Sequence, residues 1–242
     1  MVQTQYVGLL IVPKHGLQYL EVEQRRTLRA VRSWQEAIPN RDPSAAVHEA
    51  MLLTAGAVGY EATTLQDVAD RAGVSPGTVQ RRFGGRDEVF AAAYEGAAEE
   101  LVERVLEAGR QAASWRAGLR AGLAELLRFV AEQPLLAKAL ILEVRAARGE
   151  AWVKHQQLID RLIAAVDSAR QQPGALTSAS PMTAGFMVGA VEESIALEIG
   201  AGRTDEAERL LPDLAHLIVL NYFGEDEAWL ELRSGNVSAE AR

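Results

Sequence analysis

Apolar residues recur along most of this chain at intervals of three and four, the spacing of one helix face. The pattern predicts helices over 65–72, 76–83, 87–110, 115–131, 135–147, 151–171, 182–199 and 205–223. Alternating apolar and polar stretches, which would indicate strands, are nearly absent. With 242 residues, 48% of them hydrophobic, the chain can bury a proper core. We therefore expect an all-α protein.

Residues 64–86 carry the most specific signal, two short helices joined by a tight turn. Thr64 can cap the first helix, and Gly73 can end it because glycine enters the left-handed conformation cheaply. Ser75 then offers an N-cap oxygen, and Pro76 occupies the first position of the second helix. This is the layout of a helix-turn-helix DNA reader.

The second helix is expected to bury Val79 and Phe83, four residues apart, and to turn its other side to DNA. That side carries slim residues, which let a helix approach a groove, and donors that suit base edges and phosphates. Arg86, just before the next helix, is expected to reach a backbone phosphate. The predicted DNA-binding residues are Thr64, Ser75, Pro76, Gly77, Thr78, Gln80, Arg81, Arg82 and Arg86.

These motifs resemble the TetR family of one-component bacterial regulators. The resemblance is carried by Ala72-Gly73-Val74-Ser75, by Gly77-Thr78, and by Phe83 with a basic residue three positions later. The segment 59–64, Gly-Tyr-Glu-Ala-Thr-Thr, is similar to the family's turn between its first two helices. The resemblance covers residues 44–105. Gln80 and Arg82 differ from the family's usual residues, which leaves the operator sequence open.

The resemblance implies an N-terminal three-helix helix-turn-helix DNA-binding unit, followed by an all-helical ligand-binding and dimerisation domain. The expected division is an N-terminal extension over 1–43, a DNA-binding domain over 44–90, a ligand-binding and dimerisation domain over 91–223, and a frayed polar tail over 224–242. The extension is expected to hold a helix over 17–38, whose cations suit either a DNA arm or a solvated face.

The implied function is a homodimeric transcriptional regulator, a repressor released from its operator by a small molecule. The last two helices are apolar over more than one face, so a second copy is expected against them, the alternative being a central place in the monomer core. The predicted dimer contacts are Met182, Gly185, Gly189, Val191, Leu210, Leu214 and Leu217. The predicted lining of a ligand cavity is Phe129, Leu136, Leu140, Trp152, His155, Leu158, Phe186 and Glu193, each of which would otherwise be a core or solvated side chain.

Two other functions remain open from the sequence. Gly73-Val74-Ser75-Pro76-Gly77 fits the nucleophile elbow of a serine hydrolase, but that motif needs a buried strand before the serine, and the preceding residues have helical spacing. The hydrolase interpretation is therefore disfavoured, and no catalytic residue is predicted. A ligand-independent architectural DNA binder is the second alternative, which a cavity in the C-terminal domain would disfavour.

Composition narrows the picture further. The net charge is −8, but residues 87–242 hold the whole acidic excess, with 15 Lys or Arg against 25 Asp or Glu. Local charge, not net charge, decides contact with DNA. The chain has no Cys, and no metal-ligand cluster or cofactor motif is found, so neither a metal nor a cofactor is expected. The apolar run over 7–12 is too short for a signal peptide or a membrane span, which indicates a cytoplasmic protein.

Overall fold

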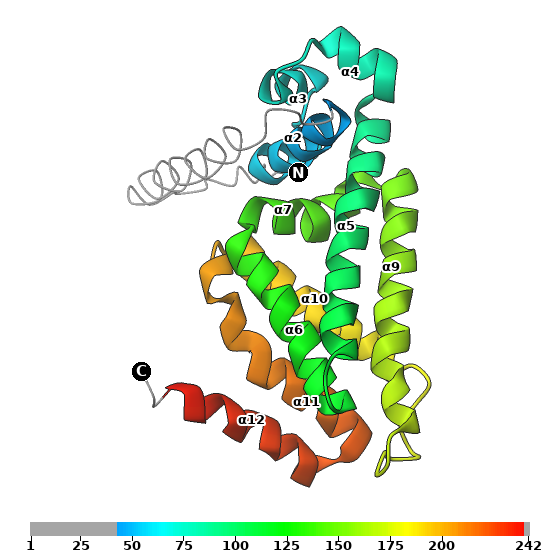
Figure 1. Ribbon diagram of the computed structural model, residues 1–242, viewed down its shortest axis with the longest axis vertical. Helices are drawn as coiled ribbons and strands as arrows, with labels where there is room; N and C mark the ends of the chain where they lie inside the picture. The colour runs from blue at the N-terminus through cyan, green and yellow to red at the C-terminus, as the bar shows by residue number, and fades with distance from the viewer. Residues whose placement is uncertain (1–42, 240–242) are drawn as a thin grey trace, which may run out of the picture. The chain divides into compact units, whose positions relative to one another are not determined.

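The computed structural model describes residues 43–239, and these residues are almost entirely helical, with no β-strand among them (Figure 1). The prediction of an all-α fold is confirmed. None of the described helices is both long and apolar enough to cross a membrane. The predicted N-terminal extension with its helix over 17–38 lies outside the described residues.

Three short helices form the N-terminal part: α2 (Pro43–Val58), α3 (Leu65–Ala72) and α4 (Pro76–Phe83). Helix α2 packs against α3 and against the start of α5. Met51, Val68 and Val79 contribute completely buried side chains to their shared core. A three-helix unit of this size can be held together because each helix gives one apolar face to that core.

Helix α5 (Arg86–Arg110) joins this unit to the rest of the chain without a break. Phe90 in its first part is buried with α2, and Leu101 in its second part is buried among the later helices. The expected domain boundary at residue 90 therefore falls inside a continuous helix. Contacts join Pro43–Arg242 into one unit, so the two predicted domains share α5.

The remaining helices build a bundle around the lower half of α5 (Figure 1). They are α6 (Trp115–Glu132), α7 (Pro134–Lys138), the π-helix η1 (Ala139–Glu143), α8 (Val144–Ala147), α9 (Gly149–Asp167), the 3₁₀-helix η2 (Ser168–Gln171), α10 (Thr183–Gly200), the 3₁₀-helix η3 (Thr204–Leu210), α11 (Leu211–Phe223) and α12 (Glu225–Ala239). Proline at the start of α7 separates it from α6, as expected from Gln133-Pro134.

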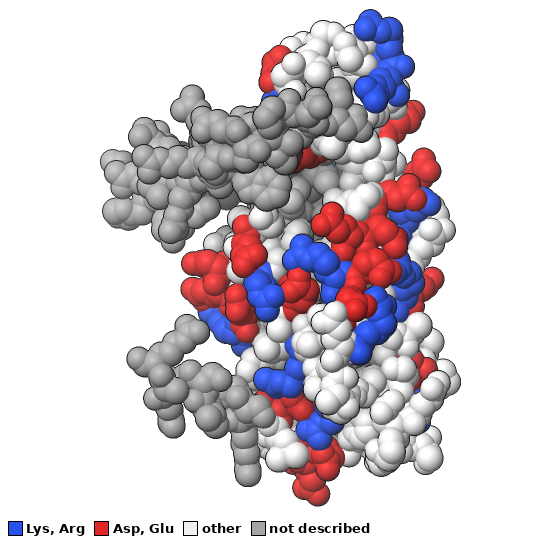
Figure 2. Space-filling model, viewed as in Figure 1, with Lys and Arg blue, Asp and Glu red and all other residues white. Residues whose placement is uncertain are grey.

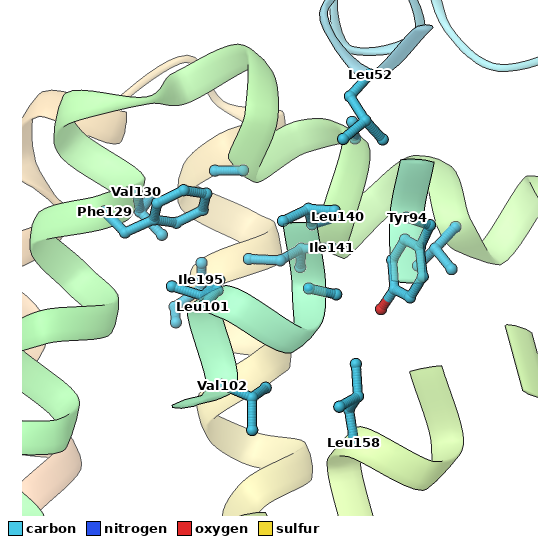
Figure 3. Close-up of a cluster of buried hydrophobic side chains, with 14 of the residues drawn as sticks. Leu52, Tyr94, Leu101, Val102, Phe129, Val130, Leu140, Ile141, Leu158 and Ile195 are labelled. Atoms are coloured by element: carbon cyan, nitrogen blue, oxygen red, sulfur yellow. The ribbon is translucent and has the colours of Figure 1, made fainter. Parts of the chain in front are cut away.

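Apolar side chains connect the N-terminal unit and the bundle in one continuous core. Figure 3 shows Leu140 and Ile141 of η1 between Leu52 of α2 and the bundle residues Leu101 and Ile195. At the same junction the backbones of α2 and α7 nearly touch, because a Cβ added to Gly56 would lie 2.1 Å from the carbonyl oxygen of Leu135. Only glycine allows this approach.

The prediction of a frayed tail from residue 224 is wrong, because residues 225–239 form α12, which packs on α11. Ala228 is completely buried, and the Glu231 carboxylate is also buried and accepts hydrogen bonds from Arg116 (2.7 Å) and Arg120 (2.8 Å). Buried carboxylates are stable when paired in this way. The polar composition of the segment concealed the pairing, since its arginine partners come from α6.

Candidate nucleic-acid interface

Helix α3 begins at a complete capping box. The Asp67 N–H donates to Thr64 Oγ1 and the Thr64 N–H donates to Asp67 Oδ2, both at 3.2 Å. The helix ends at Gly73, whose φ of 71° lies in the left-handed region. Both ends of α3 were predicted from the sequence, because caps depend on neighbouring residues only.

Helix α4 starts as the sequence predicted, with Ser75 as N-cap and Pro76 in the first turn. The Thr78 N–H donates to Ser75 Oγ (3.1 Å), and the hydroxyl oxygens of Ser75 and Thr78 lie 2.8 Å apart. Val79 is completely buried and Phe83 is partly buried against the same core. These contacts fix the rotation of α4 about its axis.

The opposite side of α4 is open and cationic. The side chains of Gln80, Arg81 and Arg82 are exposed, and Gly77 is also exposed near the start of the helix. Figure 2 shows Lys and Arg side chains gathered at the α4 end of this face, with mixed charges over the bundle helices. An exposed helix with a slim N-terminal turn and cationic donors can enter a DNA major groove.

Arg86 is more restrained than the sequence suggested. Its guanidinium carbon lies 4.4 Å from the centre of the Tyr60 ring, and Nη1 donates to the carbonyl oxygen of Glu61 (3.1 Å). Tyr60 in turn donates its hydroxyl proton to Asp87 Oδ1 (2.5 Å). Burial of the ring and this hydrogen bond raise the pKa of Tyr60 to about 12, which keeps the phenol a donor. The phosphate contact of Arg86 stays a prediction.

The nucleophile-elbow interpretation finds no support around Ser75. The residues before the turn form α3, not a strand, and the serine hydroxyl is placed as a helix cap. His155 is buried and its Nδ1 lies 2.9 Å from the Tyr94 hydroxyl, while His216 Nδ1 lies 2.9 Å from the Ala228 carbonyl oxygen. These contacts of the two histidines are made with residues of the bundle helices, not with Ser75.

Residues 54–93 match the family described as bacterial regulatory proteins of the tetR family. The match covers the end of α2, all of α3 and α4 and the start of α5, the elements whose geometry is given above. Residues 54–93 carry the DNA-binding segment of the TetR family. This confirms the resemblance seen in the motifs.

Solved structures of TetR-family regulators have the same fold. The fatty acid degradation regulator FadR from Bacillus halodurans is 14% identical, with 75% of this chain and 97% of that chain covered and a TM-score of 0.67. FadR from Bacillus subtilis, solved with stearoyl-CoA, is 17% identical over 72% and 96% of the two chains, with a TM-score of 0.64. SmeT, the repressor of a Stenotrophomonas maltophilia multidrug efflux pump, is 20% identical over 76% and 92%, with a TM-score of 0.63. None of the curated proteins matches this sequence.

The helical bundle contains an apolar cavity of about 400 Å³. It is partly open to solvent and is bordered by α5, α6, α9, η2, α10 and α11. Its lining is Val105, Leu106, Gly109, Arg110, Trp115, Gly118, Leu119, Gly122, Leu123, Leu126, Leu162, Ala165, Val166, Ser168, Val188, Val191 and Ile218. None of the eight residues predicted to line a ligand cavity is among them. The close approach of α5 and α6 at Gly118, where a Cβ would lie 2.6 Å from the Gly109 carbonyl oxygen, marks this end of the bundle.

The eight predicted cavity residues have other environments. Phe129, Leu140 and Leu158 are buried in the core, and Leu136 packs partly buried against it. Phe186, Trp152 and Glu193 are exposed. The eight residues do not line this cavity, because helical spacing shows which residues are apolar, but not which end of a bundle is left incompletely filled.

His155, also predicted to line the cavity, belongs to a buried polar cluster instead. Its Nε2 lies 3.4 Å from Glu192 Oε1, and Arg145 donates to the same oxygen at 3.0 Å. Burial disfavours the Glu192 carboxylate, but the bonds from His155 and Arg145 outweigh it and lower the pKa of that carboxyl. Burial raises the pKa of the neighbouring Tyr94 hydroxyl. The cluster ties α5, α8, α9 and α10 together.

Of the seven predicted dimer contacts, the structure buries two within the subunit. Val191 is 7% exposed and lines the cavity, and Leu214 is 4% exposed in the core. The large exposed apolar residues of α10 and its start are Met182, Phe186 and Leu197, with Gly189 on the same stripe. Gly185, Leu210 and Leu217 are half-buried. The helices were identified correctly, but the sequence could not tell which of their apolar faces points inward.

We predict that Ser75→Ala lowers the free energy of unfolding by about 0.5–2 kcal/mol through loss of the helix cap. Ser178→Ala, at an exposed loop position, is the matched control and should change stability by less than about 0.5 kcal/mol. Urea denaturation followed by circular dichroism measures both. Labelling of Ser75 by a fluorophosphonate in the folded protein would instead support the hydrolase.

Proposed function

We propose that this protein is a homodimeric repressor that reads operator DNA with α4 and leaves it when a small apolar molecule fills the cavity. The observation that carries the proposal is the exposed, cationic side of α4 behind a capped tight turn. Each dimer would place two such helices in successive major grooves, about one helical turn apart. Such a protein works where the DNA is, in the cytoplasm, and no catalytic role is proposed for it.

Charge distribution supports DNA contact at this one end. Arg81 and Arg82 lie on the exposed side of α4, while the acidic excess of the chain lies in residues 87–242. Several acidic side chains of the bundle surface are paired, for example Glu99 with Arg161 and Glu95 with Lys154, but the acidic excess remains. With a cationic α4 and a net negative bundle, the protein would approach DNA with its α4 end first.

The chemistry of the cavity indicates the class of ligand. Its polar groups already have partners within the protein: Arg110 donates to Glu107 (2.7 Å), and Ser168 donates to the Ala165 carbonyl oxygen (2.7 Å). A charge carried inside would therefore be buried without a partner, which is costly. We propose an uncharged apolar body, such as an acyl chain or aromatic rings. The stearoyl-CoA bound to Bacillus subtilis FadR provides a precedent for an acyl chain.

The dimer face is proposed on the exposed stripe of α10 and the adjoining side of α11. Phe186 and Leu197 are 64% and 63% exposed, unusually open for large apolar residues, and Leu220 on α11 is 37% exposed. Exposed apolar patches of this kind mark interaction sites. Two copies joined here would form the four-helix bundle that the family resemblance implies. The cavity disfavours the alternative of a ligand-independent architectural DNA binder.

For DNA reading, we predict that Gln80→Ala and Arg81→Ala each cost about 1–3 kcal/mol on a duplex selected from a random-sequence pool, and much less on a scrambled duplex. Arg86→Ala should weaken both duplexes similarly and reduce the salt slope by about 1 per subunit. Fluorescence anisotropy at several salt concentrations measures these effects.

Arg128→Ala is the matched control, because Arg128 is exposed on α6, away from α4. It should leave both affinities within about twofold. Equal losses on both duplexes for Gln80→Ala and Arg81→Ala would show that α4 does not read bases directly. Specificity would then come from the N-terminal turn of α4 or from DNA shape.

For assembly, we predict that Phe186→Glu and Leu197→Glu convert the dimer to a folded monomer. Both side chains are exposed within one subunit, so a carboxylate there is tolerated until a second copy buries it. Val153→Glu, at a position 53% exposed on α9, should remain dimeric. Sedimentation velocity at micromolar concentration decides, and a monomeric wild type would remove the proposed dimer.

For the ligand, we predict that the uncharged probe N-phenyl-1-naphthylamine binds with increased fluorescence, and that Leu119→Trp weakens it by about tenfold or more. The larger indole would occupy cavity volume that the probe needs. Leu136→Trp, outside the cavity lining, is the control. If both variants bind the probe as the wild type does, the probe occupies another site and the proposed cavity is not the ligand site.

A further inference from the structure

A carboxylate from the bundle holds the turn that leads into the helix-turn-helix. Glu143 Oε2 accepts a hydrogen bond from the backbone N–H of Tyr60 at 2.7 Å, and Lys138 Nζ lies 3.7 Å from the other oxygen. The Glu143 side chain is 15% exposed. Charge-assisted bonds of this kind are about twice as strong as neutral ones. Residues 83 positions apart are thereby connected across the junction.

The position of Glu143 depends on the π-helical turn of η1. A π-turn holds more residues than an α-turn, so it changes the direction in which the residues at its end point. Leu140 and Ile141 of this turn are buried in the core that joins α2 to the bundle (Figure 3). Glu143, at the end of η1, reaches the turn that follows the C-terminus of α2. A carboxylate near a helix C-terminus opposes the helix dipole, so helix electrostatics do not explain it.

The same turn is held from its other side by the first residues of α5. Tyr60 contacts Asp87 through its hydroxyl and Arg86 through its ring, and these residues follow α4 directly. Tyr60 therefore joins three segments: the end of α2, the start of α5 just beyond the reading helix, and η1 of the bundle. Its backbone N–H contacts the bundle, and its side chain contacts the start of α5.

A path of direct contacts connects the cavity to this turn. Leu123 and Leu126 of α6 line the cavity, and α6 runs into α7 at Gln133-Pro134. Helix α7 supports α2 through the Gly56–Leu135 backbone approach and continues into η1. Cores packed at this density do not deform smoothly, so a displacement of α6 must move its neighbours. Glu143 is the charged contact at the end of that path.

From this arrangement we infer that Glu143 is a positioning residue, which holds the Gly59–Thr63 turn, and with it α3 and α4, in the orientation that binds DNA. The inference rests on the proposed function, because it names the residue through which the bundle fixes the orientation of α3 and α4. It does not require Glu143 to touch DNA or ligand. Loss of its carboxylate should weaken DNA binding while leaving the cavity intact.

Hydrogen exchange tests the contact without DNA or ligand. In Glu143→Ala the Tyr60 amide loses a partner that carries a full charge, so its exchange should accelerate by about 10- to 100-fold. Glu143→Gln keeps an oxygen acceptor without the charge and should show a smaller increase. Glu125→Ala is the matched control, since Glu125 is also 15% exposed and paired with two arginines, Arg104 and Arg128, but lies on α6. It should leave Tyr60 exchange unchanged.

DNA and probe binding then test the role. Glu143→Ala should bind the selected duplex about tenfold more weakly and N-phenyl-1-naphthylamine within twofold of wild type, with Glu143→Gln between the two on DNA. A residue with only a general structural role would change both affinities together. Unchanged Tyr60 exchange, or unchanged DNA affinity despite faster exchange, would overturn the inference. A wild type that does not prefer the selected duplex would instead overturn the proposed function.

Discussion

One close-packed apolar core, shared by the helix-turn-helix and the bundle, is the constraint on which the structure depends. Leu52, Leu140 and Ile195 belong to the same cluster although they come from α2, η1 and α10 (Figure 3). At the Gly56–Leu135 contact no side chain separates the backbones. A change of volume in the bundle therefore cannot be absorbed by a flexible linker, because residues 43–239 contain none between the two parts.

Within this core the cavity provides unfilled volume, and the polar contacts fix the alignment of the helices. The bundle leaves about 400 Å³ unfilled around α5 and α6, where apolar side chains and glycines face one another. The buried carboxylate of Glu231 and the half-buried carboxylates of Glu192 and Glu143 are all paired, so they fix how the helices are aligned. Paired buried charges of this kind favour one alignment over others, even where their net contribution to stability is small.

Charge is arranged so that DNA contact is local. The ion pairs on the bundle surface are exposed and contribute little stability individually, and the acidic excess of residues 87–242 disfavours phosphate there. At the α4 end, Arg81 and Arg82 project from a helix that Val79 and the Ser75 cap hold in one rotation.

The sequence alone determined most of the helices, the caps at Thr64, Gly73 and Ser75, and the resemblance to the TetR family, because all of these depend on residues close together in the chain. Only the tertiary structure decided which faces are buried. Phe186 proved exposed and Val191 buried, α12 is held by arginines of α6, and Tyr60 meets a carboxylate 83 positions away. Periodicity states that a face is apolar. Periodicity does not show which segment packs against that face, since packing partners come from distant parts of the chain.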